Sequence, residues 1–147
     1  MTFSETLEHL PIEGVNFVFD EMARVLRTGG ILVASSPNQA SLENRIHLLK
    51  GKSILDLPKY MVVAEGIYGH IRLYTPAEMN QLMSERGFVL ERCVLESSNS
   101  AFRGNSPHSL YRTLYRLYEN AEQHLEFLRN FGDTWYMVFR KSARLPS

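Results

Sequence analysis

The sequence predicts an α/β fold, and three observations lead to this prediction. Apolar residues recur at helical spacing over residues 15–26 (VNFVFDEMARVL), which is typical of an amphipathic helix. Gly29 and Gly30 follow, and we expect both to adopt the positive φ that ends a helix. The apolar run of residues 31–34 (ILVA) lacks polar alternation, as in a strand covered on both faces. Strands and helices then keep alternating, which favours a sheet with helices on both faces.

The first half of the chain supplies further elements around this unit. Residues 1–5 (MTFSE) predict the tail of a strand, and residues 42–49 predict a second helix capped by Ser41. Residues 53–69 show a weak pattern with Pro58, Gly66 and Gly69, which indicates a loop with short helical pieces. We expect about residues 39–74 to form a lid or substrate-binding insertion above the strand ends.

The second half begins with a strong helix start. Thr75 is an N-cap residue, Pro76 occupies the first helical position and Glu78 follows three residues after the cap. Gly87 ends this helix, and residues 88–96 (FVLERCVLE) predict a strand. A polar loop leads to a long helix over residues 107–129, and residues 135–139 (WYMVF) predict the last strand.

Composition excludes several classes of protein. The 147 residues suit one domain with 44% hydrophobic content, and 16 basic residues balance 16 acidic ones, so no nucleic-acid or membrane-surface partner is indicated. Cys93 is the single cysteine, which excludes an internal disulfide and a cysteine-based zinc site; we predict a core thiol there and no metal site. No apolar run approaches the roughly 20 residues of a membrane span, and we predict a cytoplasmic protein.

Five short motifs carry a family resemblance. They are residues 4–11 (SETLEHLP), 24–30 (RVLRTGG), 36–38 (SPN), 70–75 (HIRLYT) and 85–88 (ERGF). In this order they resemble the C-terminal half of class I S-adenosylmethionine-dependent methyltransferases, especially small-molecule enzymes of the ubiquinone-biosynthesis-like kind. The resemblance covers about residues 3–96, and the remainder matches in pattern alone. It implies a partial Rossmann-like sheet containing strands four to seven of the family's seven, in the order 4-5-7-6, with the last strand antiparallel.

The N-terminal features of that family have no counterpart here. The glycine-rich turn that cradles the cofactor would appear as a GxGxG-like run, and none occurs; Met1 falls at the family's fourth strand. We therefore expect residues 1–147 to form a single truncated methyltransferase-like domain. Its first strand would lack a neighbour on one side, so we expect marginal stability, self-association, or docking on a missing N-terminal half or an intact methyltransferase.

The resemblance also assigns candidate residues at the first strand end. Ser4 and Glu5 would lie near the methionine moiety of the cofactor, S-adenosylmethionine. His9 would be the candidate base, because a histidine can take a hydroxyl proton near neutral pH. The alternative for His9 is a helix-entry histidine that is bonded to the backbone.

Two further groups are candidates for substrate binding. Ser36 and Asn38 follow the second strand and can hydrogen-bond a substrate, although turn residues of these types are equally well explained. His70, Arg72 and Tyr74 alternate, so in an extended segment they would share a face, and Arg72 could hold a carboxylate or phosphate. The alternative is a structural segment that joins the lid to the sheet.

The resemblance implies methyl transfer from S-adenosylmethionine to a small-molecule acceptor, with oxygen preferred as the acceptor atom. We expect this chain alone not to bind the cofactor, and whether it is an enzyme by itself stays open. The alternatives are a non-catalytic half domain that docks on a partner chain, and a non-functional gene remnant.

Overall fold

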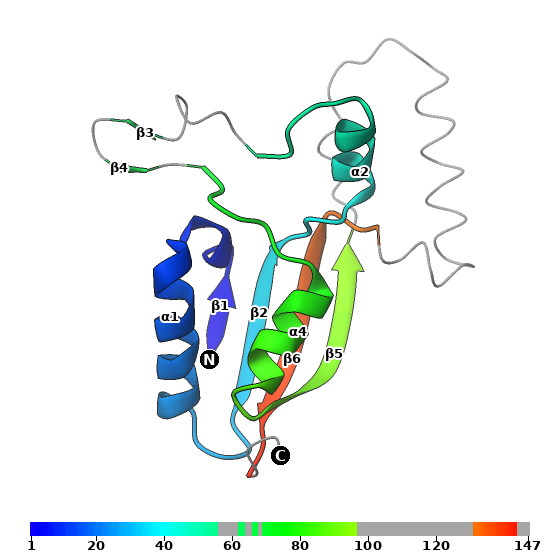
Figure 1. Ribbon diagram of the computed structural model, residues 1–147. Coiled ribbons are helices and arrows are strands. Elements are labelled where there is room, and N and C mark those ends of the chain that lie inside the picture. The colour runs from blue at the N-terminus through cyan, green and yellow to red at the C-terminus, as the bar shows by residue number, and fades with distance from the viewer. Residues whose placement is uncertain (56–61, 64–65, 68, 97–130, 144–147) are drawn as a thin grey trace, which may run out of the picture.

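The computed structural model describes residues 1–55, 62–63, 66–67, 69–96 and 131–143. It contains a four-stranded sheet in the order β1-β2-β6-β5 (Figure 1). Strand β1 (Thr2–Ser4) pairs in parallel with β2 (Ile31–Pro37), and β6 (Thr134–Lys141) runs antiparallel between β2 and β5 (Phe88–Glu96). This arrangement confirms the predicted α/β class and the strand order 4-5-7-6 with an antiparallel last strand.

Short helices connect the strands. They are the 3-10 turn η1 (Leu7–His9), α1 (Ile12–Val25), α2 (Leu42–Leu49) and α4 (Pro76–Ser84). The predicted capping box is present at α4, and Ser41 caps α2 by accepting a bond from the backbone N–H of Asn44 at 3.2 Å. Strands β3 (Val62–Val63) and β4 (Gly66–Ile67) form a small antiparallel pair in the predicted loop. Within the described residues, no helix combines the length and apolarity needed to span a membrane.

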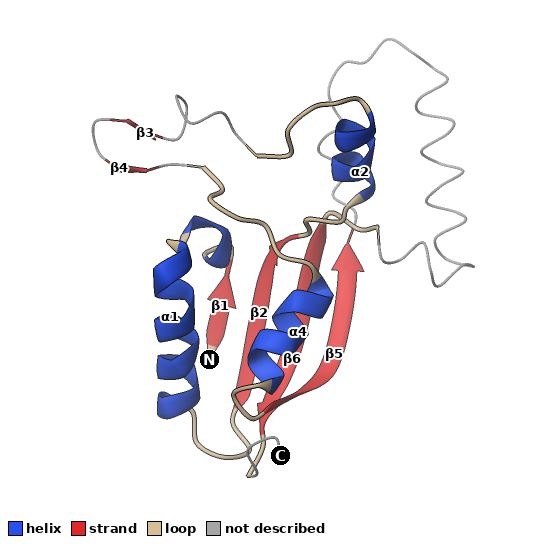
Figure 2. Cartoon of the chain, in the orientation of Figure 1, coloured by secondary structure: helices blue, strands red, loops and turns tan. Residues whose placement is uncertain are grey.

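The core lies between one face of the sheet and two helices. Trp135, Met137 and Phe139 alternate along β6 and are almost fully buried on this face. Phe19 of α1 and Met79 of α4 belong to the same apolar cluster. Helices α1 and α4 therefore lie side by side over one face, as Figure 2 shows.

The opposite face is more open than the sequence suggested. Val33, Tyr136 and Val94 lie on it and are 38%, 41% and 42% exposed. Helices on both faces were expected, but α1 and α4 cover the same face, and the predicted helix over 107–129 lies outside the described residues. A four-residue apolar run such as ILVA does not distinguish a strand covered on both faces from one that exposes a valine.

The turn before β2 depends on two glycines for different reasons. Gly29 has a φ of 77°, and its N–H donates to the carbonyl of Lys141 at 2.8 Å. The prediction of positive φ is wrong for Gly30, which is needed for space instead. A Cβ there would lie 2.7 Å from the carbonyl oxygen of Arg27 and 2.9 Å from Leu26 Cδ2. The strand that follows also runs on to Pro37, beyond the apolar run.

We predict that Gly30→Ala lowers the free energy of unfolding by about 1–3 kcal/mol, because the added methyl group overlaps a backbone oxygen. Gly14→Ala is the matched control, since a Cβ at this helical position meets nothing within 4 Å. The control should raise stability by about 0.5–1 kcal/mol through the better helix propensity of alanine. Urea unfolding of both variants measures the difference, and equal effects would contradict this account of the turn.

Candidate functional site

Polar side chains gather where β1 and β2 end, because the carboxyl ends of parallel strands meet at the same edge of a sheet. Ser4 Oγ lies 2.6 Å from Ser35 Oγ, and Ser35 Oγ donates to Glu5 Oε1 at 2.8 Å. Since the one hydroxyl proton of Ser35 is used on Glu5, Ser4 is the donor in the serine pair. The two cofactor candidates therefore lie together. Ser35, which sequence reasoning did not select, connects them.

Glu5 has an unusual backbone conformation. Its φ of 46° makes it the one non-glycine residue in the described part of the chain with positive φ. Its N–H still donates to the carbonyl of Ser35 at 3.1 Å, which holds the turn in place. Such strain is found preferentially at binding and catalytic sites. Glu5 itself is exposed, and its carboxylate accepts the hydroxyl proton of Ser35.

A second cluster surrounds His9. His9 Nδ1 lies 2.9 Å from the carbonyl oxygen of Gly69. Because a carbonyl accepts and never donates, Nδ1 carries a proton, and the neutral ring keeps its lone pair on Nε2. Nε2 lies 3.9 Å from Oε1 of the buried Glu8. The backbone bond therefore holds the ring in the tautomer that can accept a proton at Nε2.

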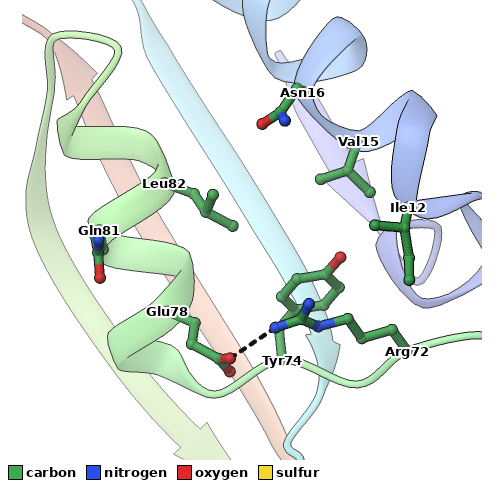
Figure 3. A pocket seen from close by; sticks show the side chains of 8 residues that line it. All are labelled: Ile12, Val15, Asn16, Arg72, Tyr74, Glu78, Gln81 and Leu82. Atoms are coloured by element: carbon green, nitrogen blue, oxygen red, sulfur yellow. Dashed lines mark hydrogen bonds and ion pairs between the residues drawn. The ribbon is translucent and has the colours of Figure 1, made fainter.

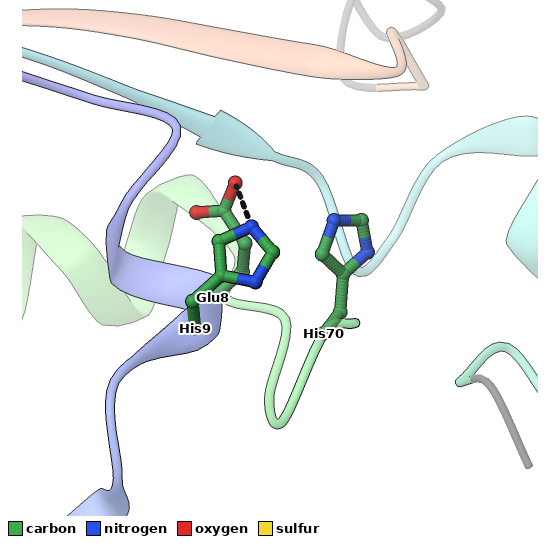
Figure 4. Close-up of side chains that lie close together, drawn as sticks. All are labelled: Glu8, His9 and His70. Carbon is green, nitrogen blue, oxygen red and sulfur yellow. Dashed lines mark ion pairs between the residues drawn. The ribbon is translucent and has the colours of Figure 1, made fainter. Parts of the chain in front are cut away.

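Glu8 and His70 complete this second cluster (Figure 4). Glu8 Oε2 accepts a bond from Ser36 Oγ at 2.8 Å, and the rings of His9 and His70 are 5.2 Å apart between centroids. One ligand atom from each of Glu8, His9 and His70 lies within 4.8 Å of the others, so the cluster could hold a metal ion. Sequence reasoning predicted no metal site and gave no role to Glu8. Glu8 could have been selected because it stands next to His9 in the sequence, whereas its proximity to His70 depends on the fold.

Asn38 is occupied by backbone contacts. Its Nδ2 donates to the carbonyl of Gly132 at 2.8 Å, and its Oδ1 accepts from the N–H of Ala40 at 3.0 Å. Asn38 is 1% exposed, and Ser36 is fully buried against Glu8. Both substrate candidates therefore shape the strand end, and neither side chain faces open solvent.

The structure separates the three residues that were expected to share a face. Their segment is not a strand, and Tyr74 alone makes an isolated bridge, with Asn38. Arg72 lies 4.8 Å from the ring centroid of Tyr74, and both line a cavity between α1 and α4. His70 is not among the residues that line this cavity and contacts His9 instead. Strand alternation therefore does not apply here.

Arg72 already has a carboxylate partner within the chain. Its Nη2 donates to Glu78 Oε1 at 3.0 Å, while Glu78 Oε2 accepts from the N–H and the hydroxyl of Thr75. Burial by itself would raise the pKa of Glu78, but the bonds from Thr75 and Arg72 together outweigh it and lower that pKa. The ion pair ties the segment before α4 to the first turn of that helix.

Cys93 is half-buried in β5. Burial raises the pKa of its thiol, so little thiolate exists near neutral pH. This agrees with the prediction of a core thiol.

The comparisons with known proteins concern the fold. No protein-family model and no curated protein matches the chain. One similar solved structure is the complex between the Haloferax volcanii Trm112 methyltransferase activator and the putative methyltransferase. The TM-score is 0.51 at 15% identity, over 99% of this chain and 54% of that one. This likeness supports a methyltransferase-like fold.

Two other solved structures give lower scores. The [4+2]-cyclase SpnF matches with a TM-score of 0.48 at 13% identity, over 97% of this chain and 49% of that one. A putative sarcosine dimethylglycine methyltransferase from Galdieria sulphuraria matches with a TM-score of 0.47 at 17% identity, over 97% and 52%. The chain thus spans about half the length of the solved structures it matches.

We predict that Ser36→Ala lowers the free energy of unfolding by about 1–3 kcal/mol, because it leaves the buried carboxylate of Glu8 without its hydroxyl donor. In a Glu8→Leu background the same change should cost much less, since no carboxylate remains to be satisfied. A double-mutant cycle from urea unfolding measures the coupling. Equal costs in both backgrounds would show that the bond contributes nothing.

We also predict a contribution of Glu78 to the pH dependence of stability. The folded pKa lies below the ordinary 4.5, so the ionised form stabilises the fold above that pH. This contribution should be lost as the pH falls below about 4.5 and through the folded pKa. Glu78→Gln should flatten that part of a stability curve measured from pH 6 to pH 3. Glu13→Gln, on the exposed first turn of α1, is the control and should leave the curve unchanged.

Proposed function

We propose that this chain forms the acceptor side of an S-adenosylmethionine-dependent methyltransferase site for a small molecule, and that another polypeptide segment completes the cofactor side. The observation that carries the proposal is the tautomer of His9, held by Gly69 beside the strand ends of a methyltransferase-like sheet. S-adenosylmethionine supplies an electrophilic methyl group, so the protein must align an acceptor, exclude water and remove a proton.

His9 is the proposed base. Its Nε2 would take the proton of an acceptor hydroxyl, which is why oxygen is the preferred acceptor atom. The buried carboxylate of Glu8, 3.9 Å away, would stabilise the imidazolium that forms. The ring of His70 would limit the movement of the His9 ring. Glu8 is thus a positioning residue that acts through His9.

The acceptor would lie between this base and the segments around it. Ser36 and Asn38 would shape the floor of the acceptor site through their hydrogen bonds, and His70 would form one of its walls. Residues 39–74 would cover the acceptor as a lid.

The residues near the end of β1 fit one part of the cofactor. Ser4 and Glu5 offer a hydroxyl and an exposed carboxylate, which suit the cationic methionine moiety. The sequence contains no GxGxG-like run to cradle the rest. We therefore propose that a second segment provides that turn.

The described part of the sheet offers a surface for such a segment. Strand β1 is the end strand of the order β1-β2-β6-β5, so an added strand can pair with its free side. Val33 and Tyr136 add exposed apolar area on the neighbouring face. A separate N-terminal half is the preferred partner; self-association through β1 is the alternative. The alternative function, a non-catalytic half domain that only docks on a partner chain, depends on the same edge of β1. We propose the cytoplasm as its location.

We predict that calorimetric titration of the isolated chain with S-adenosylmethionine gives no saturable binding at micromolar concentration. The complex purified from the native cell should bind the cofactor and transfer methyl groups. In that complex His9→Ala should lower the methyl-transfer rate by about 10²–10⁴-fold, the usual contribution of a general base, without changing cofactor affinity.

Arg24→Ala is the control, because Arg24 pairs with Glu21 on the exposed side of α1 and has no proposed role. Saturable binding by the isolated chain would overturn the need for a partner segment. Equal rates for the His9→Ala and unmodified complexes would remove His9 as the base. A complex that binds no cofactor would favour the docking alternative.

A further inference from the structure

A cavity of about 220 Å³ opens between α1 and α4 on the covered face of the sheet (Figure 3). Ile12 and Val15 of α1 and Leu82 of α4 form its apolar walls. None of Glu8, His9 and His70 belongs to its lining. The cavity is therefore separate from the proposed methyl-transfer site and needs its own explanation.

Tyr74 gives this cavity a polar floor. The residue is 3% exposed, and Figure 3 shows its hydroxyl directed toward the first turns of α1, near Ile12 and Val15. No hydrogen bond from any described residue reaches this hydroxyl. Burial raises the pKa of Tyr74, so the hydroxyl stays a neutral O–H group. A buried hydroxyl of this kind needs a hydrogen-bond partner, which a water molecule or a ligand in the cavity can supply.

Hydrogen bonds beside the cavity fix its walls relative to each other. Arg86 Nε donates to Asp20 Oδ1 at 2.7 Å, and Arg86 Nη2 donates to Asn16 Oδ1 at 2.8 Å, which ties the turn after α4 to α1. The carbonyl of Tyr74 accepts from Trp135 Nε1 at 3.0 Å, which fixes the floor. The space is therefore preformed, and binding there costs little reorganisation.

The same contacts decide which polar atoms face a ligand. The oxygen of Asn16 is used by Arg86, so its NH₂ group is the part left to donate. The Tyr74 hydroxyl can donate as well.

Arg72 and Glu78 also line the cavity, but they pair with each other at 3.0 Å and cancel in charge. Gln81 also lines the cavity, but its Nε2 donates to Glu85 Oε1 at 3.0 Å, and Figure 3 shows its side chain directed away from Tyr74. The two remaining donors and the absence of net charge favour an uncharged ligand that carries an acceptor oxygen.

We propose that this cavity is a binding site for a small uncharged carbonyl compound, namely an apolar ring that bears a carboxamide or similar group. The ring would pack between Ile12, Val15 and Leu82, and the carbonyl oxygen would accept from the hydroxyl of Tyr74. The size is adequate, since a dry protein cavity of about 150 Å³ holds a benzene molecule. This inference is independent of the cofactor and of His9.

The probe for this proposal is benzamide, titrated into the full chain and followed by protein NMR or calorimetry. A ligand with so few atoms should bind with a Kd on the order of 1 mM. Tyr74→Phe should weaken binding about fivefold, the usual effect of losing one neutral hydrogen bond. Tyr136→Phe removes a hydroxyl from the opposite face and should leave the affinity unchanged.

Two more measurements make the test decisive. Ile12→Trp should abolish binding by filling the mouth of the cavity; Ile12 is 57% exposed, so the fold tolerates the larger side chain. Far-UV circular dichroism checks that each variant is folded, since Ile12→Trp adds a second tryptophan to the one in the chain. Absence of saturable binding, equal affinity in Tyr74→Phe, or binding unaffected by Ile12→Trp would overturn the site. Tighter binding of benzoate than of benzamide would contradict the proposal that the ligand is uncharged. His9→Ala should not change benzamide affinity, which separates this test from that of the methyltransferase proposal.

Discussion

The hydrogen bond from the indole of Trp135 to the carbonyl of Tyr74 joins the two halves of this structure. Trp135 is fully buried near the start of β6, opposite Ser36 of β2, and β6 is an inner strand of the sheet. Tyr74 belongs to the segment that returns from the predicted lid. An indole N–H in an apolar core must find an acceptor, and this acceptor is supplied by the segment that carries His70 and Arg72. The positions of both polar sites follow from this constraint.

One site lies on each side of that segment. Toward the strand ends, Gly69 orients His9 and Ser36 satisfies the buried carboxylate of Glu8. Toward the helices, Tyr74 forms the floor of the cavity between α1 and α4. A short piece of chain without regular structure thus divides its side chains between two environments. The conformational entropy lost by ordering this segment is offset by the core contacts of Trp135 and by the capping box at the start of α4.

The elements themselves were predictable because their signals are local. The helical spacing before Gly29, the capping box at Thr75 and the apolar strands each require residues a few positions apart. The predictions failed where a neighbour in space decides the outcome. Gly30 is needed because of its distance from Arg27 and Leu26, and the exposure of Val33 depends on which helices cover the sheet. Neither the distance around Gly30 nor the exposure of Val33 follows from the order of residues.

The sequence by itself determined the α/β class and the order of the main helices and strands in the described part of the chain. The family resemblance, rather than local spacing, supplied the order of the strands. Only the tertiary structure decided the contacts: Glu8 with Ser36 across 28 positions, and His9 with Gly69 across 60. Secondary structure follows from short-range periodicity, whereas the tautomer of a histidine and the partner of a buried carboxylate depend on atoms that folding brings within about 3–4 Å.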